Sequence, residues 1–212
     1  MNRTELGFIV DRSGSMAGLE KDTVGGFNTM LTSHRGEEGI CQITTTLFNH
    51  QLQFLYESLD VDLVPKMTEK DFQCYGSTAL CDAVVETLLR IRYRHDTVGK
   101  EEAPDKVLVF IITDGYENAS CKYHQGHVQN LIGALKERGW EFLFLGANME
   151  AEKEGAGLGI QKEDTVDFVP DQEGISLNFE VMCEIGKDMR KYGEIRRESM
   201  DKIRKDYQSR KK

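Results

Sequence analysis

Oxygen-bearing side chains follow an apolar run close to the N-terminus. Residues 8–10 are apolar, Asp11 comes directly after them, and Ser13 and Ser15 follow at alternate positions. A short apolar run is typical of a buried strand, so we expect a carboxylate and two hydroxyls at the carboxyl end of that strand. These are hard oxygen ligands, which suit Mg2+ or Mn2+ and suit zinc or copper poorly. A single formal charge would hold a divalent ion weakly, so other segments must complete such a site.

Two later segments carry matching chemistry. Thr78 provides a hydroxyl where a helical pattern begins, and Asp114 follows the strongly apolar run 107–112. In an open parallel sheet, ligands bind at the carboxyl ends of the strands where the strand order reverses. We therefore expect Asp11 and Asp114 to lie close together.

These three segments resemble the pattern of a von Willebrand factor type A domain with its metal-ion-dependent adhesion site. The order is Asp-x-Ser-x-Ser after the first strand, a threonine in a later loop and an aspartate after the fourth strand, and the likeness covers residues 4 to 190. The resemblance implies a bound Mg2+, with Mn2+ as the alternative. It also implies that water or an acidic side chain of a partner takes the open position on the ion. The implied metal ligands are Asp11, Ser13, Ser15, Thr78 and Asp114.

Strand and helix patterns alternate along the chain, which is typical of an α/β domain. We predict a doubly wound, Rossmann-like three-layer α/β/α fold whose sheet is mostly parallel. The turn at residues 49–50 is so short that the strands around it must be antiparallel, which places a short antiparallel strand at the edge. Predicted strands cover residues 6–10, 41–48, 51–56, 106–113, 140–145 and 165–169. Predicted helices cover 21–33, 78–92, 128–138, 149–157 and 173–190.

The C-terminal end of the chain differs in charge from the rest. The whole chain has a net charge of −9, but residues from Lys187 onward hold 11 Lys and Arg against 5 Asp and Glu. We predict a von Willebrand A-like domain over residues 1–190 and a basic, helical tail over 191–212, with an amphipathic pattern from Ile195 to Tyr207. A solvated helix of mixed charge is the simpler explanation of the tail, and an interaction device is the alternative.

Composition narrows the class of protein. Hydrophobic residues make up 39% of the chain, and no apolar run has the length of a membrane helix. The N-terminus lacks the apolar segment of a secretion signal. Five scattered cysteines without a C-x-x-C motif indicate free thiols in the cytoplasm. The acidic net charge does not favour nucleic acid as a partner.

Other interpretations of these residues and of neighbouring residue groups are less well supported. Ser13 and Ser15 could merely cap a helix, but two carboxylates would then lie together without a counter-charge. Cys121, His124 and His127 could suggest a metal cluster, although a polar loop leading into a helix explains them better. Glycines at 155, 157 and 159 have the wrong spacing for a dinucleotide loop. A serine nucleophile at Ser13 or Ser15 would need a general base nearby. The sequence places none of the five histidines there.

The sequence therefore favours a binding module over an enzyme. We expect the ion to engage an Asp or Glu of a protein partner, with specificity from the surface around Arg12, Tyr75 and residues 116–118. Arg12 beside the ion could orient an acidic ligand, but the simpler expectation is that its side chain points to solvent. Two alternatives are a metal-dependent hydrolase using the same ion and a scaffold that docks through the basic tail. The family also suggests that the helix at 173–190 shifts with site occupancy.

Overall fold

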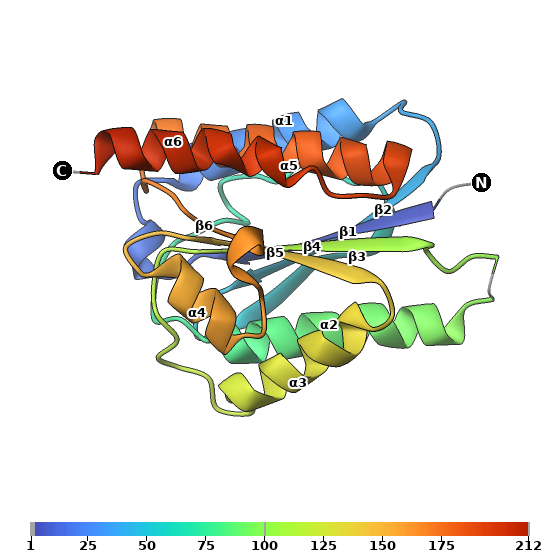
Figure 1. Ribbon diagram of the computed structural model, residues 1–212, viewed down its shortest axis with the longest axis horizontal. Coiled ribbons are helices and arrows are strands. Elements are labelled where there is room, and N and C mark those ends of the chain that lie inside the picture. Colours follow the sequence, from blue (N-terminus) through green and yellow to red (C-terminus); the bar gives the residue numbers. More distant parts are fainter. Residues whose placement is uncertain (1–2, 100, 212) are drawn as a thin grey trace.

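A six-stranded sheet runs through the middle of the molecule in the order β3-β2-β1-β4-β5-β6 (Figure 1). The computed structural model of the chain describes residues 3–99 and 101–211. Every neighbouring pair of strands is parallel except β2 and β3, which are antiparallel. The predicted doubly wound fold with one antiparallel edge strand is confirmed. The strands are β1 (Arg3–Asp11), β2 (Ile40–Phe48), β3 (Leu52–Asp60), β4 (Lys106–Thr113), β5 (Trp140–Gly146) and β6 (Thr165–Asp167).

Helices cover both faces of the sheet. In Figure 1, α1, α5 and α6 lie on one face, and α2, α3 and α4 lie on the other. The α-helices are α1 (Glu20–His34), α2 (Leu80–Thr97), α3 (Gln125–Lys136), α4 (Ala151–Gly157), α5 (Gln172–Tyr192) and α6 (Asp201–Arg210). Three 3-10 turns are η1 (Gly14–Met16), η2 (Lys162–Asp164) and η3 (Arg197–Met200).

The core has two halves, one on each face of the sheet. Alternate side chains of β1 go to opposite faces, so Phe8 packs in the layer under α1 and α5, whereas Ile9 packs in the layer under α2 and α3. The Phe8 ring meets Phe27 of α1 edge-on at 5.5 Å and stacks on Phe110 of β4 at 5.3 Å. The central strands β1 and β4 are therefore held on both faces, which fixes their carboxyl ends.

The edge strand β3 is longer than the sequence predicted. It continues to Asp60, past the predicted end at residue 56. The pairing with β2 is irregular between Ile43 and Thr46, and Ser58 adopts a positive φ of 47°. A bulge of this kind lets a strand continue while it turns side chains toward a new direction. Here it brings the Ser58 hydroxyl into a buried polar cluster with Thr44.

Residues beyond α5 pack against the body of the domain. Gly193 ends α5 in the left-handed conformation with φ 73°, and the chain then turns back through η3 and α6. The pattern from Ile195 to Tyr207 predicts a helix that starts too early, because the 3-10 turn η3 occupies Arg197–Met200 and α6 begins at Asp201. Met200 and Ile203 are each 1% exposed and belong to the core layer of α1 and α5. The boundary at residue 190 stays a prediction.

Among the described residues, no helix has both the length and the apolar character needed to cross a membrane.

Candidate functional site

The candidate site lies where the strand order reverses. From β1 the chain adds β2 and β3 on one side, and it then crosses over to add β4, β5 and β6 on the other side. Asp11 is the last residue of β1, and Asp114 follows the last residue of its neighbour β4. The two carboxylates are thus brought to the same edge of the sheet by two central strands.

Hydrogen bonds join four of the five predicted residues directly. The backbone N–H of Ser13 donates to Asp11 Oδ1 at 2.6 Å. The hydroxyls of Ser13 and Ser15 lie 3.0 Å apart, and the Ser15 hydroxyl donates to Asp114 Oδ1 at 2.5 Å. The loop after β1 therefore curls back across the end of the sheet and connects the two aspartates.

Thr78 reaches the same place from another loop. A Cβ atom built on Gly115 would lie 3.2 Å from Thr78 Oγ1 and 3.5 Å from Ser15 Oγ, so both hydroxyls lie beside the residue after Asp114. The Thr78 loop is tied to the first loop by a bond from the Gly14 N–H to the carbonyl of Gly76 at 3.0 Å. The structure thus brings all five predicted residues together, and their role as metal ligands stays a prediction.

The site concentrates negative charge away from water. Asp11 is fully buried and Asp114 is 3% exposed, whereas Ser15 is exposed. Burial raises the pKa of Asp11 to about 6, although hydrogen bonds from Thr113 and Ser13 act against the rise. Burial also raises the pKa of Asp114, and the hydrogen bond from Ser15 partly offsets this effect. Both shifts are caused by burial, and no basic side chain of the described residues forms an ion pair with either carboxylate to oppose them.

The residues present fit a hard divalent cation. Asp114 Oδ2 is buried and has no hydrogen-bond partner among the described residues, which is costly for a carboxylate oxygen unless something else compensates it. The donors around it are carboxylate and hydroxyl oxygens, the ligands that Mg2+ and Mn2+ prefer. Among the described residues, no three or more His, Cys, Asp or Glu side chains gather as metal ligands, so a cation at this site would rely on hydroxyls beside the two carboxylates.

Several supporting residues were missed by the sequence analysis. Thr113 donates its hydroxyl to Asp11 Oδ2 at 2.6 Å, and Asn118 Oδ1 accepts from the Thr78 N–H at 2.8 Å. Glu117 accepts from the Cys81 N–H at 2.7 Å, at the start of α2. A threonine directly before Asp114 was the one visible signal, because its hydroxyl is carried on the same strand end.

Arg12 does not point to solvent, so that expectation is wrong. Its side chain is buried, with the residue 7% exposed, and Nη1 donates to Gln53 Oε1 at 2.7 Å and to the carbonyl of Asp71 at 3.1 Å. The guanidinium therefore finds partners on β3 and in the segment that follows β3 instead of water. The exposed side chains of the predicted recognition surface are those of Tyr75 and Tyr116, at 44% and 49% exposure.

The histidine pair at the start of α3 has a structural explanation. His127 Nδ1 accepts from the His124 N–H at 3.2 Å, the two residues form a capping box, and the rings lie 3.7 Å apart. Cys121 is exposed, and its thiol faces the carbonyl of Ala119. The glycine at 155 allows close packing, because a Cβ atom there would meet Thr165 of β6.

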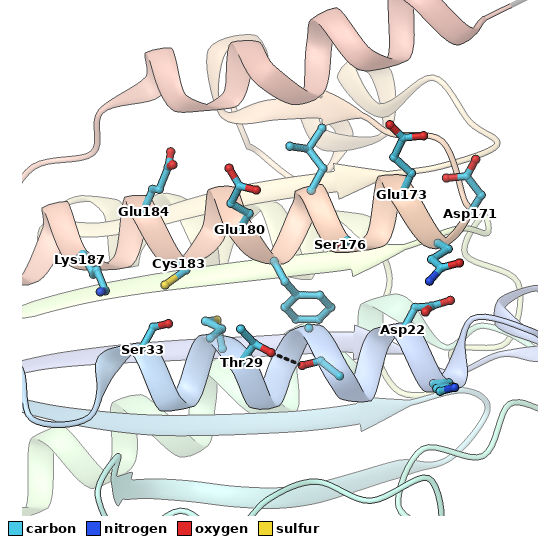
Figure 2. A pocket seen from close by; sticks show the side chains of 17 residues that line it. Asp22, Thr29, Ser33, Asp171, Glu173, Ser176, Glu180, Cys183, Glu184 and Lys187 are labelled. Atoms are coloured by element: carbon cyan, nitrogen blue, oxygen red, sulfur yellow. Dashed lines mark hydrogen bonds between the residues drawn. The ribbon is translucent and has the colours of Figure 1, made fainter.

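A groove of about 1180 Å3 lies between α1 and α5 (Figure 2). Figure 2 shows polar side chains from both helices along it, including Asp22 and Thr29 on α1 and Glu180 on α5. Gly26 lets the two helices approach, because a Cβ atom there would lie 2.5 Å from the ring of Phe179. The groove is separate from the five site residues, none of which lines it.

Comparison with known proteins finds likeness in structure. No family model matches the chain, and no curated protein matches it in sequence. The von Willebrand factor type A protein of Catenulispora acidiphila is 14% identical with a TM-score of 0.60, over 87% of this chain and 43% of that one. The vWF domain of the type V pili tip protein Mfa5 of Porphyromonas gingivalis is 9% identical with a TM-score of 0.65, over 92% and 98%. The manganese-loaded TRAP protein of Plasmodium vivax is 20% identical with a TM-score of 0.58, over 84% and 73%.

This likeness shows the class of fold. The chain has the von Willebrand factor type A fold, as its sequence motif predicted. It spans less than half of the length of the first structures it matches, at 45%, 46% and 43%. Another matched structure is proximal thread matrix protein 1 of the mussel byssus, in which the metal-ion-dependent adhesion site motif is occupied by zinc.

Proposed function

We propose that this protein binds a divalent cation at the candidate site and uses that cation to hold an acidic group of a protein partner. The cation is Mg2+ or Mn2+, and Asp11, Ser13, Ser15, Thr78 and Asp114 hold it. The observation that carries the proposal is the buried pair of carboxylates, of which Asp114 Oδ2 has no partner among the described residues. When bound, the cation supplies positive charge and an electrophilic position for an incoming oxygen ligand.

Binding is favoured over hydrolysis by the surroundings of the site. A metal-dependent hydrolase needs a general base within hydrogen-bond reach of the attacking water. None of the hydrogen bonds of the described residues joins a histidine to the five site residues. His50 lies beside the Thr78 loop, but it packs on Tyr75 at 5.8 Å and on Gly76, where a Cβ atom would collide with it.

The partner surface surrounds the exposed side of the site. Tyr75 and Tyr116 flank it as large exposed side chains, and aromatic residues are enriched where proteins bind one another. The partner therefore presents an Asp or Glu beside apolar or aromatic contacts. The carboxylate supplies dependence on the ion, and the aromatic rim supplies specificity.

Docking through the basic tail receives less support. Lys202 bonds to Glu184, Arg197 bonds to Asp164 at 2.7 Å, and Arg210 bonds to Asp171 at 2.5 Å. These basic side chains are therefore engaged with acidic groups of the domain. The predicted division into a domain over residues 1–190 and a tail over 191–212 is retained only as a proposal. The five cysteines are free thiols, which supports the cytoplasm as the proposed compartment.

The direct test is calorimetric titration of the metal-stripped chain with Mg2+ and with Mn2+. We expect saturable binding that Asp11→Ala abolishes and that Asp62→Ala, a change at an exposed aspartate, leaves intact. Water-proton relaxation of the Mn2+-loaded chain, measured while N-acetyl-aspartate is added, then reports whether a carboxylate displaces water from the ion. Equal ion binding by the wild type and Asp11→Ala would refute the metal site. Ion binding without any carboxylate effect would refute the proposed mode of partner binding.

A further inference from the structure

A second buried carboxylate lies toward the other end of β1. Glu5 is fully buried, and its Oε1 accepts from the hydroxyls of Thr44 at 2.5 Å and Ser58 at 2.7 Å. Its Oε2 lies 2.6 Å from Nε2 of His95, near the carboxyl end of α2. The positive φ of Ser58 is a strained conformation, which persists only where the surroundings hold it. This network therefore fixes the imidazole in one orientation.

The other side of the imidazole faces a small pocket. The His95 side chain is 6% exposed, its ring packs on Trp140 at 5.4 Å, and no hydrogen bond to a described residue involves its Nδ1 atom. The pocket has a volume of about 150 Å3. Its polar lining comes from Arg3, Gln42, Arg94, His95 and Glu102. It belongs to the amino-terminal edge of the sheet, roughly 26 Å along β1 from the candidate metal site at 3.3 Å per residue.

The lining has the chemistry of an oxyanion site. Among the described residues, neither the Arg3 nor the Arg94 guanidinium makes an ion pair or a side-chain hydrogen bond. Guanidinium groups bind planar and tetrahedral oxyanions through parallel N–H donors. The His95 ring, which is held at Nε2 by Glu5, adds its second nitrogen to the polar lining. Two guanidinium groups and an imidazole held in place by Glu5 thus line the same pocket.

We propose that this pocket binds a small free oxyanion of the phosphate class. Its volume is far below the roughly 300 Å3 or more of pockets that hold nucleotide-sized ligands, so the ligand is inorganic phosphate or an ion of similar size. Glu102 also lines the pocket and is an acceptor only. A protonated phosphate can donate to that carboxylate, whereas sulfate at neutral pH has no proton to donate. The pocket therefore selects phosphate over sulfate.

The test is titration of the full chain with inorganic phosphate in the presence of EDTA. EDTA keeps phosphate from binding through a metal ion at the other site. We expect saturable binding, a shift of the His95 ring resonances, and weaker binding of sulfate. Arg94→Gln and Arg3→Gln should each weaken phosphate binding roughly tenfold or more, because each removes a charge-assisted hydrogen bond.

Arg90→Gln is the matched control, because Arg90 lies on the same helix and pairs with Glu57 at 3.0 Å, outside the pocket. It should bind phosphate as the wild type does, and so should Asp11→Asn. Absence of saturable phosphate binding, or equal binding by the two arginine variants and the control, would overturn the proposal. Loss of binding in Asp11→Asn would place the anion at the metal site and overturn it as well. These outcomes are independent of whether the chain binds Mg2+.

Discussion

The metal-free protein should become more stable when Asp11 is replaced by Asn. Burial raises the pKa of Asp11 to about 6, whereas its ordinary value is 3.8. The folded state therefore holds this proton more tightly than the unfolded state. Stability is lost as the pH rises from about 4 to about 6, and the full cost of the buried charge remains at higher pH. Asp11→Asn removes that charge, and the amide oxygen can still accept from the Ser13 N–H.

The size of the effect follows from the two pKa values. Ionisation of Asp11 in the folded state costs about 1.6 kcal/mol at about pH 5 and about 3 kcal/mol at about pH 7.5, as upper values for an intact fold. In EDTA, the advantage of Asp11→Asn over the wild type should therefore grow by about 1.4 kcal/mol between these two pH values. Mg2+ should reverse the order, since a ligand at about 1,000 times its dissociation constant adds about 4.1 kcal/mol to the wild type alone.

Urea unfolding followed by circular dichroism measures these differences. The control is Asp62→Asn, which removes an exposed carboxylate and should leave the unfolding free energy within about 0.5 kcal/mol of the wild type. The reasoning is refuted if Asp11→Asn is less stable than the wild type in EDTA at neutral pH. It is equally refuted if the difference between the two proteins does not change with pH.

Two further predictions concern the packing of α1. Gly25→Ala should stabilise the protein by about 0.5 to 1 kcal/mol, because its Cβ meets nothing within 4 Å, whereas Gly26→Ala should destabilise it by about 1 to 2 kcal/mol through collision with an α5 ring. Equal midpoints in urea would contradict this difference. Burial, assisted by the nearby Arg190, lowers the pKa of His34 from 6.5 to about 4. Stability should therefore fall by up to about 3 kcal/mol as the pH drops through this window, and a His34→Gln variant with the same pH profile would contradict the assignment.

The strand ends that carry the site were predictable from sequence alone. The bounds of β4 match the prediction at both ends, because Lys106 and Asp114 enclose an unbroken apolar run. Both faces of a buried central strand are apolar, so the strand appears in the sequence as a continuous apolar run. The first acidic residue after this run marks the end of the strand. Asp11 and Asp114 are the acidic residues that mark the ends of the two apolar runs. The same two residues therefore predict the strand ends and the metal-site motif.

The start of α2 was not predictable in this way. The helix begins at Leu80, two residues after Thr78, and its N-cap residue offers no side-chain cap. Instead, Glu117 from the loop after β4 accepts from the Cys81 N–H, and Asn118 accepts from the Thr78 N–H. A cap supplied by a residue so distant in the chain leaves no local signal. Thr78 is thereby freed from the helix and remains in the loop beside the two aspartates.

The two buried carboxylates of β1 show why one end of the strand is suited to a cation. Glu5 is surrounded by two hydroxyl donors and an imidazole at 2.6 Å, so both of its oxygens have partners within the protein. Asp11 receives one N–H and one hydroxyl, and its neighbour Asp114 receives a single hydroxyl and leaves one buried oxygen unpaired. No basic side chain bonds to either aspartate within the described chain. One end of β1 therefore carries a carboxylate whose two oxygens have partners within the protein. The other end places Asp11 beside Asp114 of the neighbouring strand β4, a pair that lacks a positive charge, which a divalent ion would supply.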